Sequence, residues 1–132
     1  MRKNPGQRDR MFEVSIKRAF SAAHHLKGYD GDCSRLHGHN WVVKVLVHTE
    51  RLDNIGISVD FRRLKTELDK VLDELDHCNL NELKIFEGSN PTSEEISRFI
   101  YRKLSSNINT AGAKVAKVTI FESESTSASF FE

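Results

Sequence analysis

A short stretch of the chain, Cys33-Ser34-Arg35-Leu36-His37-Gly38-His39, holds one thiol and two imidazoles. Another imidazole, His24, lies a few residues upstream in Phe20-Ser21-Ala22-Ala23-His24. Zinc binds imidazole nitrogen well, and catalytic zinc sites keep three protein ligands and one open position. A nearby cation lowers the pKa of a thiol and so increases its thiolate fraction. This part of the sequence therefore predicts an enzyme with a metal site.

The three histidines lie on two predicted β-strands that position them. In the first, over residues 12–22, apolar side chains occupy the even positions, and His24 keeps that face if the strand continues. In the second, over about residues 37–47, His37 and His39 share the odd-numbered apolar face. A glycine-containing loop separates the strands, so we expect an antiparallel pair that brings the three imidazoles together.

Alternatives exist for the ligand set. His25 is the competing third ligand, although strict alternation turns it away from His24. His48 faces the other way at the far end of its strand, and we interpret it as a surface residue. The predicted set contains no carboxylate, and iron or copper would also accept three imidazoles, so zinc is the favoured metal. Ordinary polar histidines are the alternative to a metal site. Gly38, between two ligands, would let a backbone or a substrate come close.

Other side chains could move protons or hold a substrate. Cys33 lies near the predicted metal, although a small loop residue is the simpler interpretation. Asp76 could orient His77 and make it a proton-transfer group; the alternative is a histidine at a helix C-terminus. Glu122 shares the inward face of an apolar strand, where an acid needs a partner such as a cyclic guanidine-like group. Glu124 on the same face is the competing acid.

The other elements predict an α+β domain. Apolar spacings of three and four indicate a helix over about residues 60–75, and Thr92 opens a capping box for a second helix. Residues 76–90 look irregular, and strands are expected over 114–122 and 128–131. The order of two strands, two helices and two strands favours an antiparallel sheet with both helices on one face.

Composition excludes several classes of protein. The chain has 132 residues, 30% charged and 38% hydrophobic, which suits one domain. We expect residues 1–10 to form a flexible basic tail, with a nucleic-acid arm as the alternative, and residues 11–132 to form a single catalytic domain. The net charge of +1 gives no reason to expect nucleic acid or a membrane as partner. Two cysteines make no disulfide framework and the N-terminus lacks an apolar segment, so we expect a cytoplasmic protein.

Together these segments resemble the 6-pyruvoyl-tetrahydropterin synthase family over most of residues 12–122. Five motifs follow the family's order: Phe20-Ser21-Ala22-Ala23-His24, His37-Gly38-His39-Asn40, Leu75-Asp76-His77 with Leu80-Asn81, Asn90-Pro91-Thr92-Ser93-Glu94, and Glu122. The first two are similar to the family's zinc motifs and the third to its catalytic Asp-His segment. The fourth is similar to its helix-opening motif, and the last to its pterin-anchoring glutamate.

The resemblance implies roles for the residues in these motifs. Zn²⁺ would be held by His24, His37 and His39 and would polarise the side-chain oxygens of a pterin. The remaining site residues would act on the substrate: Cys33 as the thiolate that takes protons, Asp76 and His77 as the relay, Glu122 as the pterin anchor, and Thr92 as a nearby binding group. Lys27, Arg35 and Lys117 are candidates for the triphosphate, and nothing in the spacing selects among them.

The gap between Cys33 and His37 is similar to that of the branch that forms 6-carboxy-5,6,7,8-tetrahydropterin for queuosine and 7-deazaguanine biosynthesis. The implied reaction converts 7,8-dihydroneopterin triphosphate and water into 6-carboxytetrahydropterin, acetaldehyde and triphosphate. Pyruvoyl-forming members usually have a longer gap, and elimination of triphosphate to 6-pyruvoyl-tetrahydropterin is the alternative. A zinc or pterin-binding module without catalysis is the alternative from another class. The implied fold is the tunnelling fold (T-fold), assembled as a homohexamer, a dimer of trimers, with sites at subunit contacts.

Overall fold

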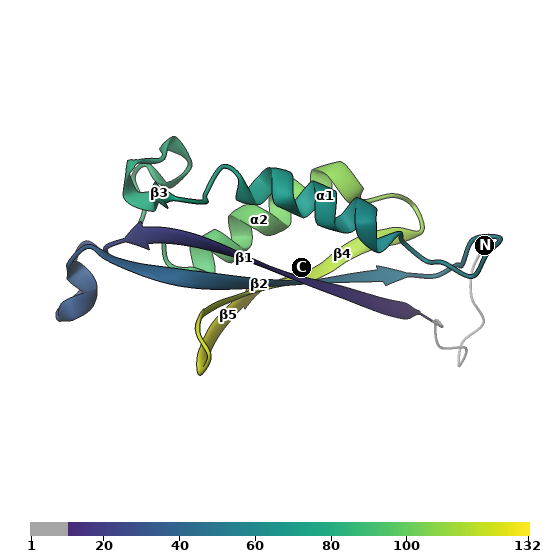
Figure 1. The fold of residues 1–132 in the computed structure, drawn as a ribbon, viewed down its shortest axis with the longest axis horizontal. Helices are drawn as coiled ribbons and strands as arrows, with labels where there is room; N and C mark the ends of the chain where they lie inside the picture. Colours follow the sequence, from purple (N-terminus) through teal and green to yellow (C-terminus); the bar gives the residue numbers. More distant parts are fainter. Residues whose placement is uncertain (1–10) are drawn as a thin grey trace.

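The computed structural model describes residues 11–132, so the basic tail predicted for residues 1–10 lies outside the described residues. The main elements in chain order are β1 (Phe12–His24), β2 (His37–Thr49), α1 (Phe61–Leu72), β3 (Cys78–Asn79), α2 (Ser93–Ile108), β4 (Ala113–Ser123) and β5 (Thr126–Phe130). The strands form one sheet in the order β3-β1-β2-β4-β5. Both helices pack on the same face of this sheet, as Figure 1 shows. The predicted α+β class is confirmed.

One strand was missing from the prediction. β3 lies within the segment expected to be irregular and pairs in parallel with β1, through Ala22 with Cys78 and Ala23 with Asn79. The sheet is therefore mixed. The predicted order ββααββ lacks β3, and the prediction of wholly antiparallel pairing is wrong for the pair of β1 and β3. A strand of two residues has no alternation that a sequence could reveal.

The long hairpin of β1 and β2 follows the predicted alternation. The strands pair antiparallel from Phe12 opposite Thr49 to His24 opposite His37. Burial alternates along both strands, with Trp41 and the valines that follow it at odd positions fully buried. Nε1 of Trp41 donates to the carbonyl of Ala22 at 3.1 Å, which satisfies the one polar atom of this buried ring. This register places the histidines at one end of a rigid sheet.

A side chain caps the N-terminus of each helix. The carboxylate of Asp60 accepts from the backbone N–H of Arg62 at 2.9 Å, and Oγ1 of Thr92 accepts from that of Glu95 at 3.1 Å. The apolar side chains that both helices bury against the sheet are Leu64, Leu68, Val71, Leu72, Ile96, Ile100 and Leu104. Phe61 is the first residue of α1 and is 51% exposed.

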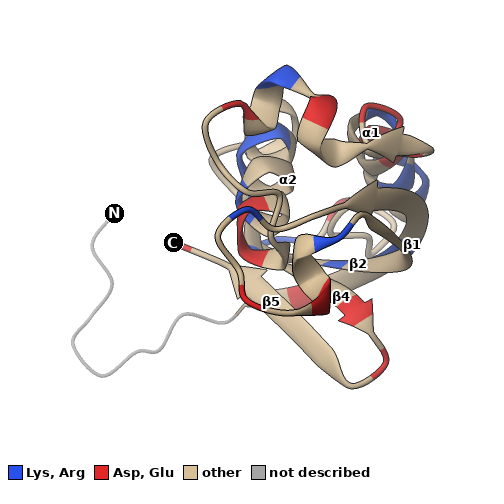
Figure 2. Ribbon diagram, turned by 90° about the vertical axis from the view of Figure 1, so that its left-hand side faces the viewer, with Lys and Arg blue, Asp and Glu red and all other residues tan. Residues whose placement is uncertain are grey.

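Basic and acidic residues are interspersed along the ribbon in Figure 2, and acidic residues lie at the end of β4 and in the turn into β5. Within residues 11–132, neither helix combines the length and the apolar character that a membrane span requires.

Candidate active site

Four side chains from three strands meet at one end of the sheet. His24 ends β1, His37 and His39 begin β2, and Glu122 lies near the end of β4. The ligand atoms of these four residues all lie within 4.8 Å of one another. The strand register explains the meeting, because His24 is directly opposite His37 and Ala22 is opposite His39. The three predicted ligands are brought together, and a carboxylate joins them that the predicted ligand set did not contain.

Backbone carbonyls fix the orientation of two of the rings. Nδ1 of His24 lies 2.7 Å from the carbonyl oxygen of Pro91, and Nδ1 of His37 lies 2.7 Å from that of Arg35. A carbonyl oxygen only accepts hydrogen bonds, so both Nδ1 atoms carry the proton. Nε2 of each ring then keeps its lone pair, which is the arrangement that metal-binding histidines use.

The polar atoms of these four side chains are arranged as ligands for a metal ion. Among the described residues, the buried Nε2 atoms of His24 and His39 have no hydrogen-bond partner. Oε1 of Glu122 lies 3.5 Å from the first and 2.8 Å from the second, without hydrogen-bond geometry. Burial lowers the pKa of both imidazoles, which favours the neutral form that binds metals. Three nitrogens and one carboxylate oxygen fit a divalent metal such as zinc.

Asp76 and His77 form an ion-pair contact at the turn after α1. Nδ1 of His77 lies 3.0 Å from Oδ2 of Asp76, and Oδ1 of Asp76 accepts from the backbone N–H of Ser21 at 2.9 Å. The bond from Ser21, and after it the His77 side chain, hold the pKa of Asp76 below its ordinary value. His77 has a φ of 58°, in the left-handed region that a residue with a Cβ rarely adopts. The turn presents its ring to solvent, with the side chain 83% exposed.

An open pocket of about 510 Å³ connects the two groups of residues. It is lined by residues 21–23 of β1, 38–40 of β2 and 77–79 around β3, so His39 and His77 share it. Gly38 lines the pocket as well. A Cβ at Gly38 would meet only the carbonyl oxygen of Ala22, at 3.9 Å, so protein packing leaves room for a side chain there.

Cys33 and Thr92, also predicted to act on the substrate, are outside the lining of this pocket. Cys33 is half-buried in a 3-10 helix, Asp32–Ser34, within the loop between β1 and β2 and outside the pocket lining. Thr92 uses its hydroxyl to cap α2, directly after the Pro91 carbonyl that orients His24. The other cysteine, Cys78, is half-buried with its Sγ 3.4 Å from the carbonyl oxygen of Asp76.

The three triphosphate candidates lie on separate segments. Lys27 follows β1 and lines a second pocket, of about 670 Å³. Arg35 is exposed just before β2. Nζ of Lys117, in the middle of β4, lies 5.7 Å from the centre of the Phe131 ring. Their geometry selects none of them.

Comparison with known proteins identifies the family. The family model described as 6-pyruvoyl tetrahydropterin synthase matches residues 13–132. The chain belongs to this family. It is therefore a tetrahydropterin synthase-like lyase, which confirms the predicted enzyme class.

The relatives and solved structures carry different activity names. A Synechocystis protein named 6-carboxy-5,6,7,8-tetrahydropterin synthase is 41% identical over 91 residues, covering 65% of this chain and 69% of the relative. A Dictyostelium discoideum 6-pyruvoyl tetrahydrobiopterin synthase is 33% identical, covering 69% of this chain and 76% of its own. The structure of Caenorhabditis elegans 6-pyruvoyl tetrahydropterin synthase matches with a TM-score of 0.81 at 28% identity, covering 96% of this chain and 99% of that one. The predicted T-fold is confirmed.

Proposed function

We propose that this chain is a zinc-dependent 6-carboxytetrahydropterin synthase of queuosine and 7-deazaguanine biosynthesis. It would convert 7,8-dihydroneopterin triphosphate and water into 6-carboxytetrahydropterin, acetaldehyde and triphosphate. The observation that carries the proposal is the convergence of three imidazoles, two of them oriented by backbone carbonyls, beside a pocket that also contains His77. The name of the Synechocystis relative and the spacing of Cys33 from His37 support the 6-carboxy product.

His24, His37 and His39 would hold the zinc ion through Nε2. Their Nδ1 protons are committed to carbonyls in two of the three rings, so the rings need not rotate when metal binds. A bound zinc ion would supply Lewis-acid polarisation to the oxygens of the substrate side chain. Iron or copper remains the alternative metal for the same imidazoles.

Protons would be moved by Cys33 and by the Asp76–His77 pair. Breaking the carbon–carbon bond that releases acetaldehyde requires a base near the substrate side chain and an acid for the departing carbon. In the proposal, the Cys33 thiolate takes a proton from the substrate. Asp76 stays ionised and keeps a proton on Nδ1 of His77, which leaves Nε2 to exchange protons in the pocket.

Glu122 would hold the pterin ring, with Thr92 nearby. A carboxylate can accept two parallel N–H bonds from the guanidine-like edge of a pterin. The position of Glu122 beside His39 supports this role, because a ring anchored there would extend its side chain over the metal ligands. The hydroxyl of Thr92 already accepts a bond from Glu95, so it has its proton left to donate.

The wider proposal covers assembly and location. Residues 11–132 form one catalytic domain that acts in the cytoplasm as a homohexamer, a dimer of trimers. β5 at the edge of the sheet supports assembly, since pairing with another copy would satisfy its free backbone groups.

A second activity has its own support. The names of the Dictyostelium and C. elegans relatives favour elimination of triphosphate to 6-pyruvoyl-tetrahydropterin. Incubation of zinc-loaded protein with dihydroneopterin triphosphate, followed by mass identification of the pterin, separates the possibilities. 6-Carboxytetrahydropterin is expected; 6-pyruvoyl-tetrahydropterin would favour the second activity, and unchanged substrate would favour a binding module.

A further inference from the structure

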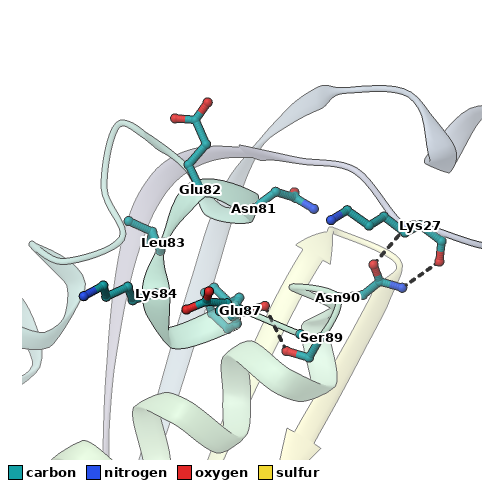
Figure 3. Close-up of a pocket in the computed structure, with 10 residues that line it drawn as sticks. Lys27, Asn81, Glu82, Leu83, Lys84, Glu87, Ser89 and Asn90 are labelled. Atoms are coloured by element: carbon teal, nitrogen blue, oxygen red, sulfur yellow. Dashed lines mark hydrogen bonds between the residues drawn. The ribbon is translucent and has the colours of Figure 1, made fainter.

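Two asparagine side chains bind the backbone just after β1. Oδ1 of Asn81 accepts from the N–H of His25 at 2.9 Å, and its Nδ2 donates to the carbonyl of His25 at 2.9 Å. Asn90 makes the same two bonds with Lys27, again at 2.9 Å each, as Figure 3 shows. Each amide therefore takes the place of a neighbouring strand, because it offers one donor and one acceptor to a single residue.

Leu26, between His25 and Lys27, is bonded to the loop between β1 and β2. The N–H of Leu26 donates to the carbonyl oxygen of Cys33 at 2.8 Å. The ring of His24, directly before this segment, is bonded to the carbonyl oxygen of Pro91. Every residue from 24 to 27 thus has a specific polar partner, although the regular strand ends at His24.

Both asparagines are themselves held in place. The N–H of Asn81 donates to Oδ1 of Asn79 at 3.1 Å, and Asn79 belongs to β3, which pairs with β1. Asn90 precedes the buried Pro91 at the start of α2. The bonds therefore tie the segment to the sheet on one side and to α2 on the other.

We propose that Asn81 and Asn90 are positioning residues that set the path of residues 25–27. Through this path they fix the distance between the His24 imidazole and the Cys33 loop, which is bonded to Leu26. The catalytic consequence rests on the proposed function, in which His24 binds zinc and Cys33 takes a proton. Preorganised groups avoid an ordering cost at the moment of reaction, and small displacements of such groups slow catalysis strongly.

Variants that replace each asparagine amide with an apolar side chain test the proposal. Asn81→Leu and Asn90→Leu keep approximate size and remove both bonds, and Asn54→Leu in an exposed loop is the matched control. Relative to wild type, we expect zinc affinity, measured by chelator competition, to fall about 10-fold in both variants. We also expect kcat at saturating zinc to fall about 10-fold or more with little change in KM. The rate at which iodoacetamide alkylates Cys33, measured by peptide mapping, should change in both variants. The alkylation rate of Cys78 should not change. Values equal to those of Asn54→Leu in all three measurements would overturn the proposal.

Hydrogen exchange in the wild-type protein gives a test that does not depend on a variant folding. The amide protons of His25 and Lys27 should exchange about 100-fold more slowly than that of exposed Tyr29, since each is bonded to an asparagine oxygen. Exchange as fast as that of Tyr29 would overturn the proposal.

Failure of this inference and failure of the proposed function give different results. Hydrogen exchange and Cys33 alkylation need no pterin. They therefore test the positioning role of the two asparagines even if the wild-type protein has no pterin lyase activity. If the wild-type protein is active and both variants match the control in every measurement, the positioning role is contradicted and the proposed function is not.

Discussion

Oε1 of Glu122 lies 2.8 Å from Nε2 of His39. The residue predicted to anchor a pterin therefore contacts an imidazole predicted to bind metal. One carboxylate cannot give the same oxygen to a metal and to a pterin ring. The two roles make different predictions for the same substitution.

Glu122→Gln should keep zinc and lose substrate binding. Three imidazoles are enough for a catalytic zinc site, so about one zinc per chain is expected by metal analysis. Loss of a charged hydrogen bond to substrate costs about 1.5–3 kcal/mol, which lowers kcat/KM by roughly 10- to 150-fold. Glu124→Gln, in the exposed turn, is the control and should behave as wild type. Loss of zinc from Glu122→Gln alone would show instead that Glu122 is a ligand.

His37→Ala should lose the metal. Removal of a ligand should weaken binding by more than the roughly 10- to 100-fold that changes around a ligand cause. His48→Ala is matched to it, because His48 lies on the same strand but pairs with Glu13 at 2.8 Å, far from the cluster. Equal zinc content in the two variants after dialysis would refute the assignment.

Cys33→Ala should abolish turnover and leave zinc content unchanged. Loss of a positioned base typically reduces a rate by about 100- to 10,000-fold. Cys78→Ala removes the other thiol, whose Sγ faces backbone carbonyls, and should keep most activity. Undiminished turnover by Cys33→Ala would contradict the assignment of Cys33 as the base.

Asp76→Asn should change the acid stability of the protein. The folded-state pKa of Asp76 is lowered, so its charged form stabilises the fold above the unfolded pKa near 4, and this contribution is lost as pH falls through the folded value. The Tm of wild type should exceed that of Asp76→Asn at pH 7, and the difference should shrink below about pH 4. A difference that stays constant from pH 7 to pH 3 would contradict this account.

Strand alternation accounts for most of what the sequence predicted correctly. A period of two residues placed His24 with Phe20 and Ala22, and His39 with Trp41, on faces that are buried together. The inward direction of Glu122 followed from the same rule. Its contact with His39 could not be predicted, because it depends on the register between β2 and β4.

The features that the sequence did not predict lie in residues 76–90, where apolar residues show no helical or strand periodicity. The bonds of Asn81 and Asn90 join residues 56 and 63 positions apart in the chain. An asparagine in a loop is typical of a turn, so residue type alone does not indicate a distant backbone partner. The short β3 was missed for a related reason, since its pairing with Ala22 and Ala23 depends on the tertiary fold.

Acetaldehyde yield tests the central claim most directly. Zinc-loaded wild-type protein is incubated with 7,8-dihydroneopterin triphosphate, and acetaldehyde is measured against substrate consumed. The proposed reaction predicts one acetaldehyde for each substrate molecule. Complete consumption of substrate without acetaldehyde would contradict it.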